Sequence, residues 1–326
     1  MTVLWLSLGI CLLLAGGAAL VSGSSRLAGR LGISPALVGL TVVAFGTSAP
    51  ELVVNVIGAL ENETSLAFGN VAGSNIANLG LVLGVAAIIR PVNLQGQLVR
   101  RELALLMLVT SMLAVMVIDS ALSEGETRIS RSDGLILLLM FSTVIYISLG
   151  DLLRSRQDPL VLRAEGLEQA MAPTESTAAG RDWLYIGAGV FGLLVGGQLT
   201  ITYGAQLASL LGMPPVIIGL LVVALGTSMP ELVTSVIAAM RREADLCVGN
   251  VLGSNLFNIL FVLPSSALVR PLPIPEGGLL DVLFSLALAV AIMLVFLTGK
   301  ALMGRITGLV FVLAYFGYMT YRVVGA

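Results

Sequence analysis

Residues 46–51 read Gly-Thr-Ser-Ala-Pro-Glu, and residues 226–231 read Gly-Thr-Ser-Met-Pro-Glu. The offset of 180 residues holds without a gap over a longer stretch, since aligning 32–91 with 212–271 gives 31 identities in 60 positions. The chain is therefore an internal duplication. Each copy places a carboxylate, hydroxyl groups and a proline inside otherwise apolar sequence.

Composition places this duplication in a membrane. Of the 326 residues, 57% are hydrophobic and 11% are charged, and the mean hydropathy is +1.01. This leaves too little polar surface for a water-soluble domain of that length. Apolar stretches of about 20 residues, the length that spans a bilayer, predict ten helices, five in each half, near 3–22, 34–60, 65–89, 102–119, 133–151, 183–210, 213–240, 245–268, 279–298 and 303–324.

The first apolar stretch indicates a transmembrane helix rather than a signal peptide. No basic segment precedes it, and Gly16-Gly17 match Gly196-Gly197 in the second copy. The two cysteines lie in apolar sequence and indicate neither a disulfide framework nor a metal cluster. The absence of histidine excludes histidine-based catalysis, and the net charge of −2 gives no reason to expect a nucleic-acid partner.

Basic residues predict the orientation of the helices. An odd number of spans in each half makes the second copy cross the membrane in the opposite sense, which is an inverted-topology repeat. Cytoplasmic connections carry an excess of Lys and Arg, so we expect the N- and C-termini to lie outside. That orientation places Arg128, Arg131, Arg270 and Arg322 outside and the larger set inside, namely Arg26, Arg30, Arg90, Arg100, Arg101, Arg154, Arg156, Arg163, Arg181, Arg241, Arg242, Lys300 and Arg305.

The duplication also predicts the domain organisation. Residues 1–151 form the first five-helix repeat and residues 183–326 the second, with the duplicated motifs at about 39–84 and 219–264. Residues 152–182 are a polar cytoplasmic linker, which is too short for a folded domain.

Glu51 and Glu231 are the residues of the motifs that most directly indicate a function. Of the 19 acidic residues, they alone lie well inside apolar spans, where an ionised carboxylate costs about 2.5 kcal/mol or more. Neither span offers an Arg or Lys, so a bound cation is the expected counter-charge. The helix should also break between Gly46 and Pro50, and likewise at Pro230, because proline removes a backbone donor. Such breaks free carbonyl oxygens as further ligands.

A structural interpretation competes with this one. Ser48 and Glu51, like Ser228 and Glu231, have the spacing of a capping box, in which the serine and the glutamate satisfy the first amides of a helix. The box explains why a helix restarts, but it does not explain why the helix restarts in the middle of a membrane. It is also compatible with ion binding.

Neutral oxygens complete the predicted site. Ser74 and Asn78, and in the second copy Ser254 and Asn258, are spaced i, i+4 and so share one helix face. An all-oxygen set is typical of hard cations. Ca²⁺ accepts about 6–8 oxygens in flexible geometry, whereas Mg²⁺ demands a strict octahedron, so the set favours Ca²⁺. Two carboxylates balance one Ca²⁺ or two Na⁺, and competition for the same oxygens would couple the two ions.

The duplicated motifs resemble those of the sodium/calcium exchangers in the cation/calcium antiporter superfamily, especially the short members of bacterial inner membranes. The resemblance implies a site between the second, third, seventh and eighth helices, reached alternately from each side as the first and sixth helices slide. It implies Na⁺ and Ca²⁺ as substrates within a lipid bilayer, with no cofactor and no obligatory protein partner. Carried onto this sequence, the ligands are Glu51, Glu231, Thr47, Ser48, Thr227, Ser228, Ser74, Asn78, Ser254, Asn258 and the backbone carbonyls of Ala44 and Ala224.

The sequence leaves the coupling ion open. Some relatives carry an aspartate where this chain has Asn258, so the site here has only two carboxylates. We expect a secondary antiporter that uses inward Na⁺ movement to expel Ca²⁺. The alternatives are H⁺/Ca²⁺ exchange, K⁺-dependent Na⁺/Ca²⁺ exchange and, from a different class, a passive cation channel. An enzyme is not expected, because the chain has no histidine and no cofactor fingerprint.

Overall fold

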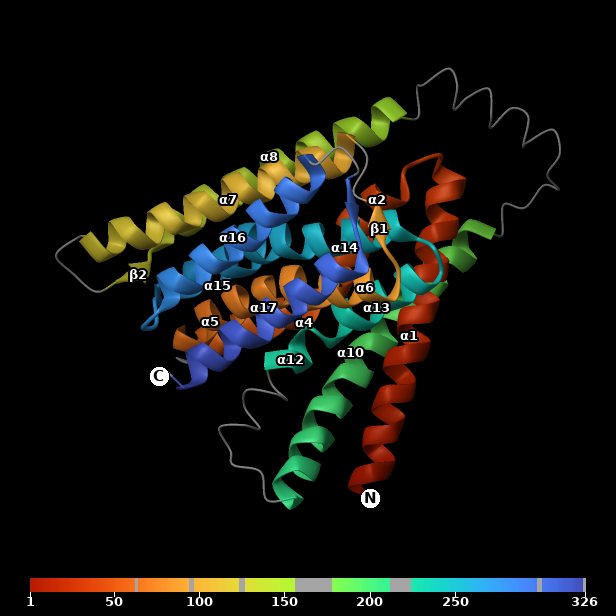
Figure 1. The fold of residues 1–326 in the computed structure, drawn as a ribbon, viewed down its shortest axis with the longest axis horizontal. Coiled ribbons are helices and arrows are strands. Elements are labelled where there is room, and N and C mark those ends of the chain that lie inside the picture. Colours follow the sequence, from red (N-terminus) through yellow and green to blue (C-terminus); the bar gives the residue numbers. More distant parts are fainter. Residues whose placement is uncertain are drawn as a thin grey trace.

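The computed structural model is a bundle of long helices with short strands at its ends (Figure 1). Within its described residues, seven helices are long and apolar enough to cross a membrane, or eight if the bent pair Pro35–Thr47 and Ala49–Leu60 counts as one span. The predicted class of helical membrane protein is confirmed, while the count of ten spans stays a prediction. The residues described are 1–61, 64–93, 97–122, 127–155, 178–211, 224–297 and 301–324.

The elements described in the second half follow the order of their counterparts in the first half, and the residues equivalent to α2 and η1 lie outside the described part of the chain. The first half has α1 (Thr2–Leu31), α2 (Pro35–Val38), the π-helix η1 (Gly39–Val43), α3 (Ala44–Thr47), α4 (Ala49–Leu60), α5 (Thr64–Ile76), the π-helix η2 (Ala77–Val82), α6 (Leu83–Ile89), β1 (Val92–Asn93), α7 (Gln97–Leu122), β2 (Arg128–Ile129) and α8 (Arg131–Ser155). The second half has α10 (Ala178–Leu210), α12 (Ala224–Thr227), α13 (Met229–Met240), α14 (Ala244–Phe257), the π-helix η4 (Asn258–Val262), α15 (Leu263–Val269), β3 (Leu272–Pro273), α16 (Gly278–Leu297), β4 (Leu302–Met303) and α17 (Arg305–Val324).

Both predicted helix breaks are confirmed. The chain bends by 43° between α3 and α4, and Ser48 between them has φ −88° and ψ 8°. Ser228 separates α12 from α13 with nearly the same backbone, φ −87° and ψ 6°. Pro50 and Pro230 then stand in the first turn of the new helix, where no intrahelical donor is needed. Residues 213–223 of the predicted span 213–240 lie outside the described residues.

Helices α8 and α10 extend into the predicted linker 152–182 from both sides, and its boundaries stay a prediction. Helix α8 continues to Ser155 and α10 begins at Ala178, while residues 156–177 lie outside the described residues. The start of α10 is held in place because the buried carboxylate of Asp182 pairs with two arginines of α1. Such a cross-helix ion pair depends on tertiary structure, so polarity alone did not reveal it.

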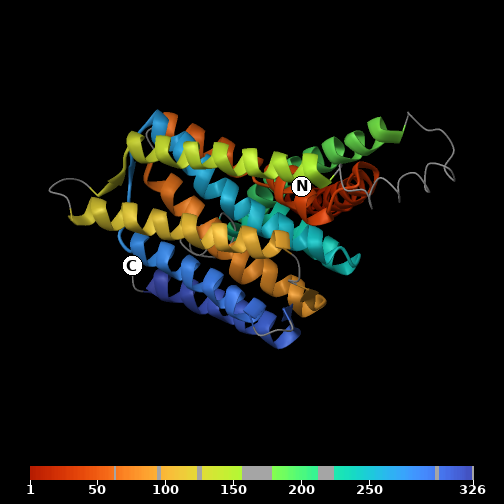
Figure 2. The ribbon, with the colours of Figure 1, turned by 90° about the horizontal axis from the view of Figure 1, so that it is seen from above.

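The two most buried candidate spans form the centre of the bundle. They are Ala67–Ile89 and Ala244–Val269, of which 78% and 94% are buried. Around them, α7 packs against α16, α8 against α15 and α17 against α6. In Figure 2, the yellow α7 and the yellow-green α8 cross in front of parts of the central helices, and the blue α16 and α17 lie along one edge. The motif residues Ser74, Asn78, Ser254 and Asn258 therefore lie on the spans most shielded from the surroundings.

Helices α1 and α10 lie side by side at one end of the bundle (Figure 1). Glycines make their close approach possible. A Cβ atom added at Gly189 would lie 2.6 Å from the backbone nitrogen of Leu20, and one at Gly196 would lie 2.6 Å from that of Leu13. Small residues of this kind let helix backbones meet inside membranes.

Each half contributes one strand to each of two antiparallel pairs. Val92 of β1 pairs with Met303 of β4, and Arg128 of β2 pairs with Pro273 of β3. Figure 1 places β1 and β2 at opposite ends of α7, so the two strand pairs lie at opposite ends of the bundle.

Candidate cation site

The twelve predicted ligands lie on elements that meet across the two halves. Helix α3 of the first half packs against α14 of the second, and α12 of the second packs against α5 of the first. All ten predicted side-chain ligands are buried, with at most 7% of any of them exposed. By element they are Ala44 and Thr47 in α3, Ser48 at the break, Glu51 in α4, Ser74 in α5, Asn78 in η2, Ala224 and Thr227 in α12, Ser228 at the second break, Glu231 in α13, Ser254 in α14 and Asn258 in η4.

Glu51 and Glu231 come from opposite halves, on α4 and α13, and both are 0% exposed. The hydroxyl of Ser48 donates to Oε1 of Glu231 at 2.9 Å, which joins the two halves directly. Among the described residues, Oε2 of Glu231 and both carboxylate oxygens of Glu51 find no hydrogen-bond partner. Both carboxylates are therefore buried without a basic partner in this part of the chain.

Other buried carboxylates in the described part of the chain have a basic partner. Asp182, Asp281 and Glu102 each contact an arginine side chain. Among these residues no such ion pair includes Glu51 or Glu231, so the missing counter-charge is specific to the duplicated motif.

Six of the predicted ligands have a buried side-chain oxygen without a protein partner. Buried polar atoms are normally paired, and each unpaired one costs about 1–3 kcal/mol. A cation accepts electron pairs from several oxygens, so it is a suitable partner for atoms that lack one among the described residues. The six residues are Glu51, Glu231, Ser74, Asn78, Ser228 and Asn258.

The capping-box interpretation is wrong. Ser48 and Ser228 do occupy the N-cap positions of α4 and α13, but neither side chain makes a cap hydrogen bond. The hydroxyl of Ser48 donates to the carboxylate of Glu231, and a hydrogen bond to a charged acceptor of this kind is stronger than one between neutral groups. A true cap exists nearby at Ser34, whose hydroxyl accepts from the amide of Leu37 at 3.2 Å.

The hydroxyl of Thr47 starts a hydrogen-bond chain that sequence reasoning did not assign. It donates to Oδ1 of Asn250 at 3.1 Å, and Nδ2 of Asn250 donates to the hydroxyl of Ser235 at 2.9 Å. The single hydroxyl proton of Thr47 can go to Asn250 or to the backbone oxygen of Ala44 at 3.3 Å, and Oγ of Ser254 lies 3.4 Å away. The hydroxyl oxygen keeps at least one lone pair that a cation can share.

An equivalent chain starts in the other half. Thr227 donates to Oδ1 of Asn70 at 3.4 Å, and Nδ2 of Asn70 donates to Oδ1 of Asn55 at 3.2 Å. The signal for these asparagines was present in the sequence, since Gly-Asn recurs at 69–70 and 249–250. Their partners lie on another helix or in the other half, which a repeat alone does not identify.

The backbone of the site differs from expectation in two respects. The helix break leaves the carbonyl of Ala44 with protein partners, because this oxygen accepts from the amide of Ser48 at 2.9 Å and lies 3.3 Å from the hydroxyl of Thr47. In addition, Asn78 and Asn258 lie in π-helices, which no pattern in the sequence indicated. π-Helical turns are frequent at functional sites, where they shift the hydrogen-bond register of a helix.

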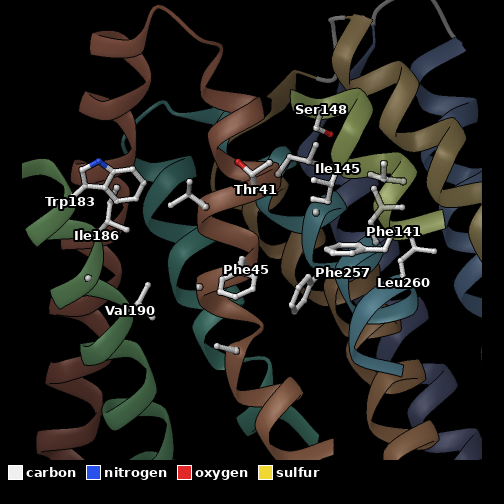
Figure 3. Close-up of a pocket in the computed structure, with 18 residues that line it drawn as sticks. Thr41, Phe45, Phe141, Ile145, Ser148, Trp183, Ile186, Val190, Phe257 and Leu260 are labelled. Carbon is white, nitrogen blue, oxygen red and sulfur yellow. The ribbon is translucent and has the colours of Figure 1, made fainter. Parts of the chain in front are cut away.

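An apolar pocket of about 600 Å³ lies beside α3 and is distinct from this cluster. In Figure 3, Phe45 of α3 lies between Val190 of α10 and Phe257 of α14, with Phe141 of α8 beyond it. The pocket is lined by uncharged side chains and by none of the predicted ligands. It therefore does not provide the charge that a cation site needs.

The family match to this chain falls into two segments, one in each half. The family "Sodium/calcium exchanger protein" matches residues 1–150 and 182–324. The putative antiporter CaxA of Alkalimonas amylolytica is 33% identical over 319 residues, covering 95% of both chains. Inner membrane protein YrbG of Escherichia coli is 35% identical over 268 residues, covering 82% of this chain and 79% of YrbG.

The fold has solved counterparts as well. A structure of the sodium-calcium exchanger NCX_Mj, soaked with 2.5 mM Na⁺ and 0.1 mM Sr²⁺, is 28% identical and superimposes with a TM-score of 0.80. The match covers 98% of this chain and 99% of that one. The duplication, the buried carboxylates and these matches agree, and the chain belongs to the sodium/calcium exchanger family, a family of transporters rather than enzymes.

Proposed function

We propose that this chain is a secondary antiporter that exchanges Na⁺ for Ca²⁺ across the membrane by alternating access. The observation that carries the proposal is the cluster of buried oxygens without protein partners, to which both halves contribute a carboxylate. Two carboxylates balance one Ca²⁺ or two Na⁺, so the two ions would compete for one site. Na⁺ is supported as the coupling ion by the likeness to NCX_Mj, which is named a sodium-calcium exchanger.

The proposed ligands are those expected from the sequence. Thr47 and Ser48 each donate their hydroxyl proton to a protein acceptor, so their oxygens turn lone pairs toward the remaining space. The carboxylates supply the charge, and the neutral oxygens complete the coordination that Ca²⁺ prefers. The full proposed set is Glu51, Glu231, Thr47, Ser48, Thr227, Ser228, Ser74, Asn78, Ser254, Asn258 and the carbonyls of Ala44 and Ala224.

The proposal includes ten spans in two inverted repeats, 1–151 and 183–326, with both termini outside. The strand pairs support inversion, because equivalent strands β1 and β3 lie at opposite ends of the bundle. The positive-inside distribution supports the orientation. The likeness to an inner membrane protein of Escherichia coli supports a bacterial inner membrane as the location.

The test is Ca²⁺ uptake by purified protein in liposomes under one imposed gradient at a time. Vesicles loaded with Na⁺ should take up radiolabelled Ca²⁺, whereas vesicles with only a K⁺ or pH gradient should not. Uptake that follows the pH gradient and ignores Na⁺ would assign H⁺/Ca²⁺ exchange instead. Uptake that needs no counter-ion would assign a passive channel.

A further inference from the structure

Asn75 connects the two halves at the centre of the bundle. Its Nδ2 donates to the backbone oxygen of Asn255 at 3.4 Å, and its Oδ1 accepts from Nδ2 of Asn258 at 3.2 Å. At most 2% of each of the three residues is exposed. Asn75 lies on α5 of the first half, and its two partners lie on α14 and η4 of the second.

The backbone oxygen of Asn255 sets the direction of this chain of bonds, because a carbonyl can only accept. Asn75 must therefore turn Nδ2 toward it, which leaves Oδ1 facing Asn258. Asn258 must in turn present its own Nδ2, since the opposite orientation would place two amide oxygens in contact. The Oδ1 of Asn258 is consequently left without a protein partner, which is what a hard cation requires of a ligand.

The duplicated residues are arranged differently. Asn255 is the equivalent of Asn75, and Asn78 is the equivalent of Asn258. Nδ2 of Asn255 donates to the carbonyl of Val251 within its own helix at 2.7 Å, and its Oδ1 has no partner. Neither side-chain atom of Asn78 has a partner. Asn75 therefore holds the amide of Asn258, whereas Asn255 does not contact the equivalent amide of Asn78 among the described hydrogen bonds.

We infer that Asn75 is a positioning residue. It holds the amide of Asn258 so that Oδ1 of Asn258 is free for the cation. The inference rests on the proposed function and assigns a role to a residue outside the proposed ligand set.

The test is a double-mutant cycle on Ca²⁺ affinity, measured by equilibrium binding of radiolabelled Ca²⁺ to purified protein. Asn75→Ala should weaken binding by about five- to tenfold, the loss of one hydrogen bond. A carboxylate has two equivalent oxygens and needs no orientation, so in an Asn258→Asp background the same substitution should cost less than about twofold.

An equal loss in both backgrounds would mean that Asn75 acts only by packing the helices, and no loss in either would mean that it has no role. Both results overturn the inference. Asn75→Ser gives the same comparison if the alanine variant does not fold. If the unchanged protein binds no Ca²⁺, the proposed function itself is wrong, and the inference is overturned with it.

Discussion

At the scale of the residue, the site is costly as long as no ion fills it. Glu51 and Glu231 are buried together without a basic partner, and several neutral oxygens around them lack hydrogen bonds. An arrangement of this kind reduces the stability of the empty protein and is retained for function. Stability and ion binding should therefore respond in opposite directions to the same substitution.

Glu51→Gln and Glu231→Gln should each abolish Ca²⁺ transport and raise the unfolding temperature of the ion-free protein by a few degrees. Removing one partner of a buried charge pair costs about 3–5 kcal/mol, so Ca²⁺ affinity should fall by more than about 100-fold. Flux in liposomes and thermal unfolding measure the two effects. Glu61→Gln, at an exposed helix end, is the matched control and should change neither.

Ser48→Ala should weaken Ca²⁺ binding by about tenfold, because its hydroxyl donates to a carboxylate of the site and does not cap a helix. Ser34→Ala is the converse control, since Ser34 caps α2 and its loss should cost about 1 kcal/mol of stability. If Ser48→Ala destabilised the protein and left Ca²⁺ binding intact, the capping role would have to be reinstated.

The sequence was sufficient to identify the two carboxylates, but it did not identify the asparagine contacts between the halves. Glu51 and Glu231 are conspicuous because an ionised group inside an apolar span is expensive wherever it lies. Asn75 is not conspicuous, since its partners are a backbone oxygen and an amide of the other half. That relation depends on how the two halves dock, and a one-dimensional repeat does not contain it.

At the scale of the element, proline chemistry predicted the broken helices, and side-chain patterns did not predict the π-helices. A proline fixes a local break whatever surrounds it, which is why both breaks fall where expected. The π-helical turns η2 and η4 change the backbone hydrogen-bond register and have no comparable residue signature.

The contact between α1 and α10 depends on glycine at one face of α10. Gly189→Ala should destabilise the protein by about 1–3 kcal/mol, because the new methyl group would meet the immobile backbone of Leu20. Gly187→Ala on the same helix meets nothing within 4 Å and should be neutral or slightly stabilising. Thermal unfolding compares them, and equal behaviour of the two variants would contradict the close contact described for these helices.

At the scale of the whole molecule, the duplication gives two equivalent strand pairs at opposite ends of the bundle. The repeat predicted two similar halves, and loop charges predicted their inversion. The repeat does not tell which strand pair lies on which side of the membrane. The positive-inside rule compares basic residues summed over many loops, so it does not place any single loop.

Cysteine labelling resolves this in a background lacking Cys11 and Cys247. Arg128→Cys in β2 should react with an impermeant maleimide added to intact cells, and Leu302→Cys in β4 should react only in inverted vesicles. Both positions are exposed on the protein, so reactivity reports the side of the membrane. Labelling of both positions from the same side would contradict the inverted topology.

The central claim is that one buried site, shared by both halves, holds either Ca²⁺ or Na⁺. Equilibrium binding of radiolabelled Ca²⁺ to purified protein at rising Na⁺ concentration tests it most directly. The account predicts one Ca²⁺ per chain, displaced by Na⁺ with a dependence steeper than first order, and no binding in Glu51→Gln or Glu231→Gln. Ca²⁺ binding that ignores Na⁺, or that survives in either variant, would contradict it.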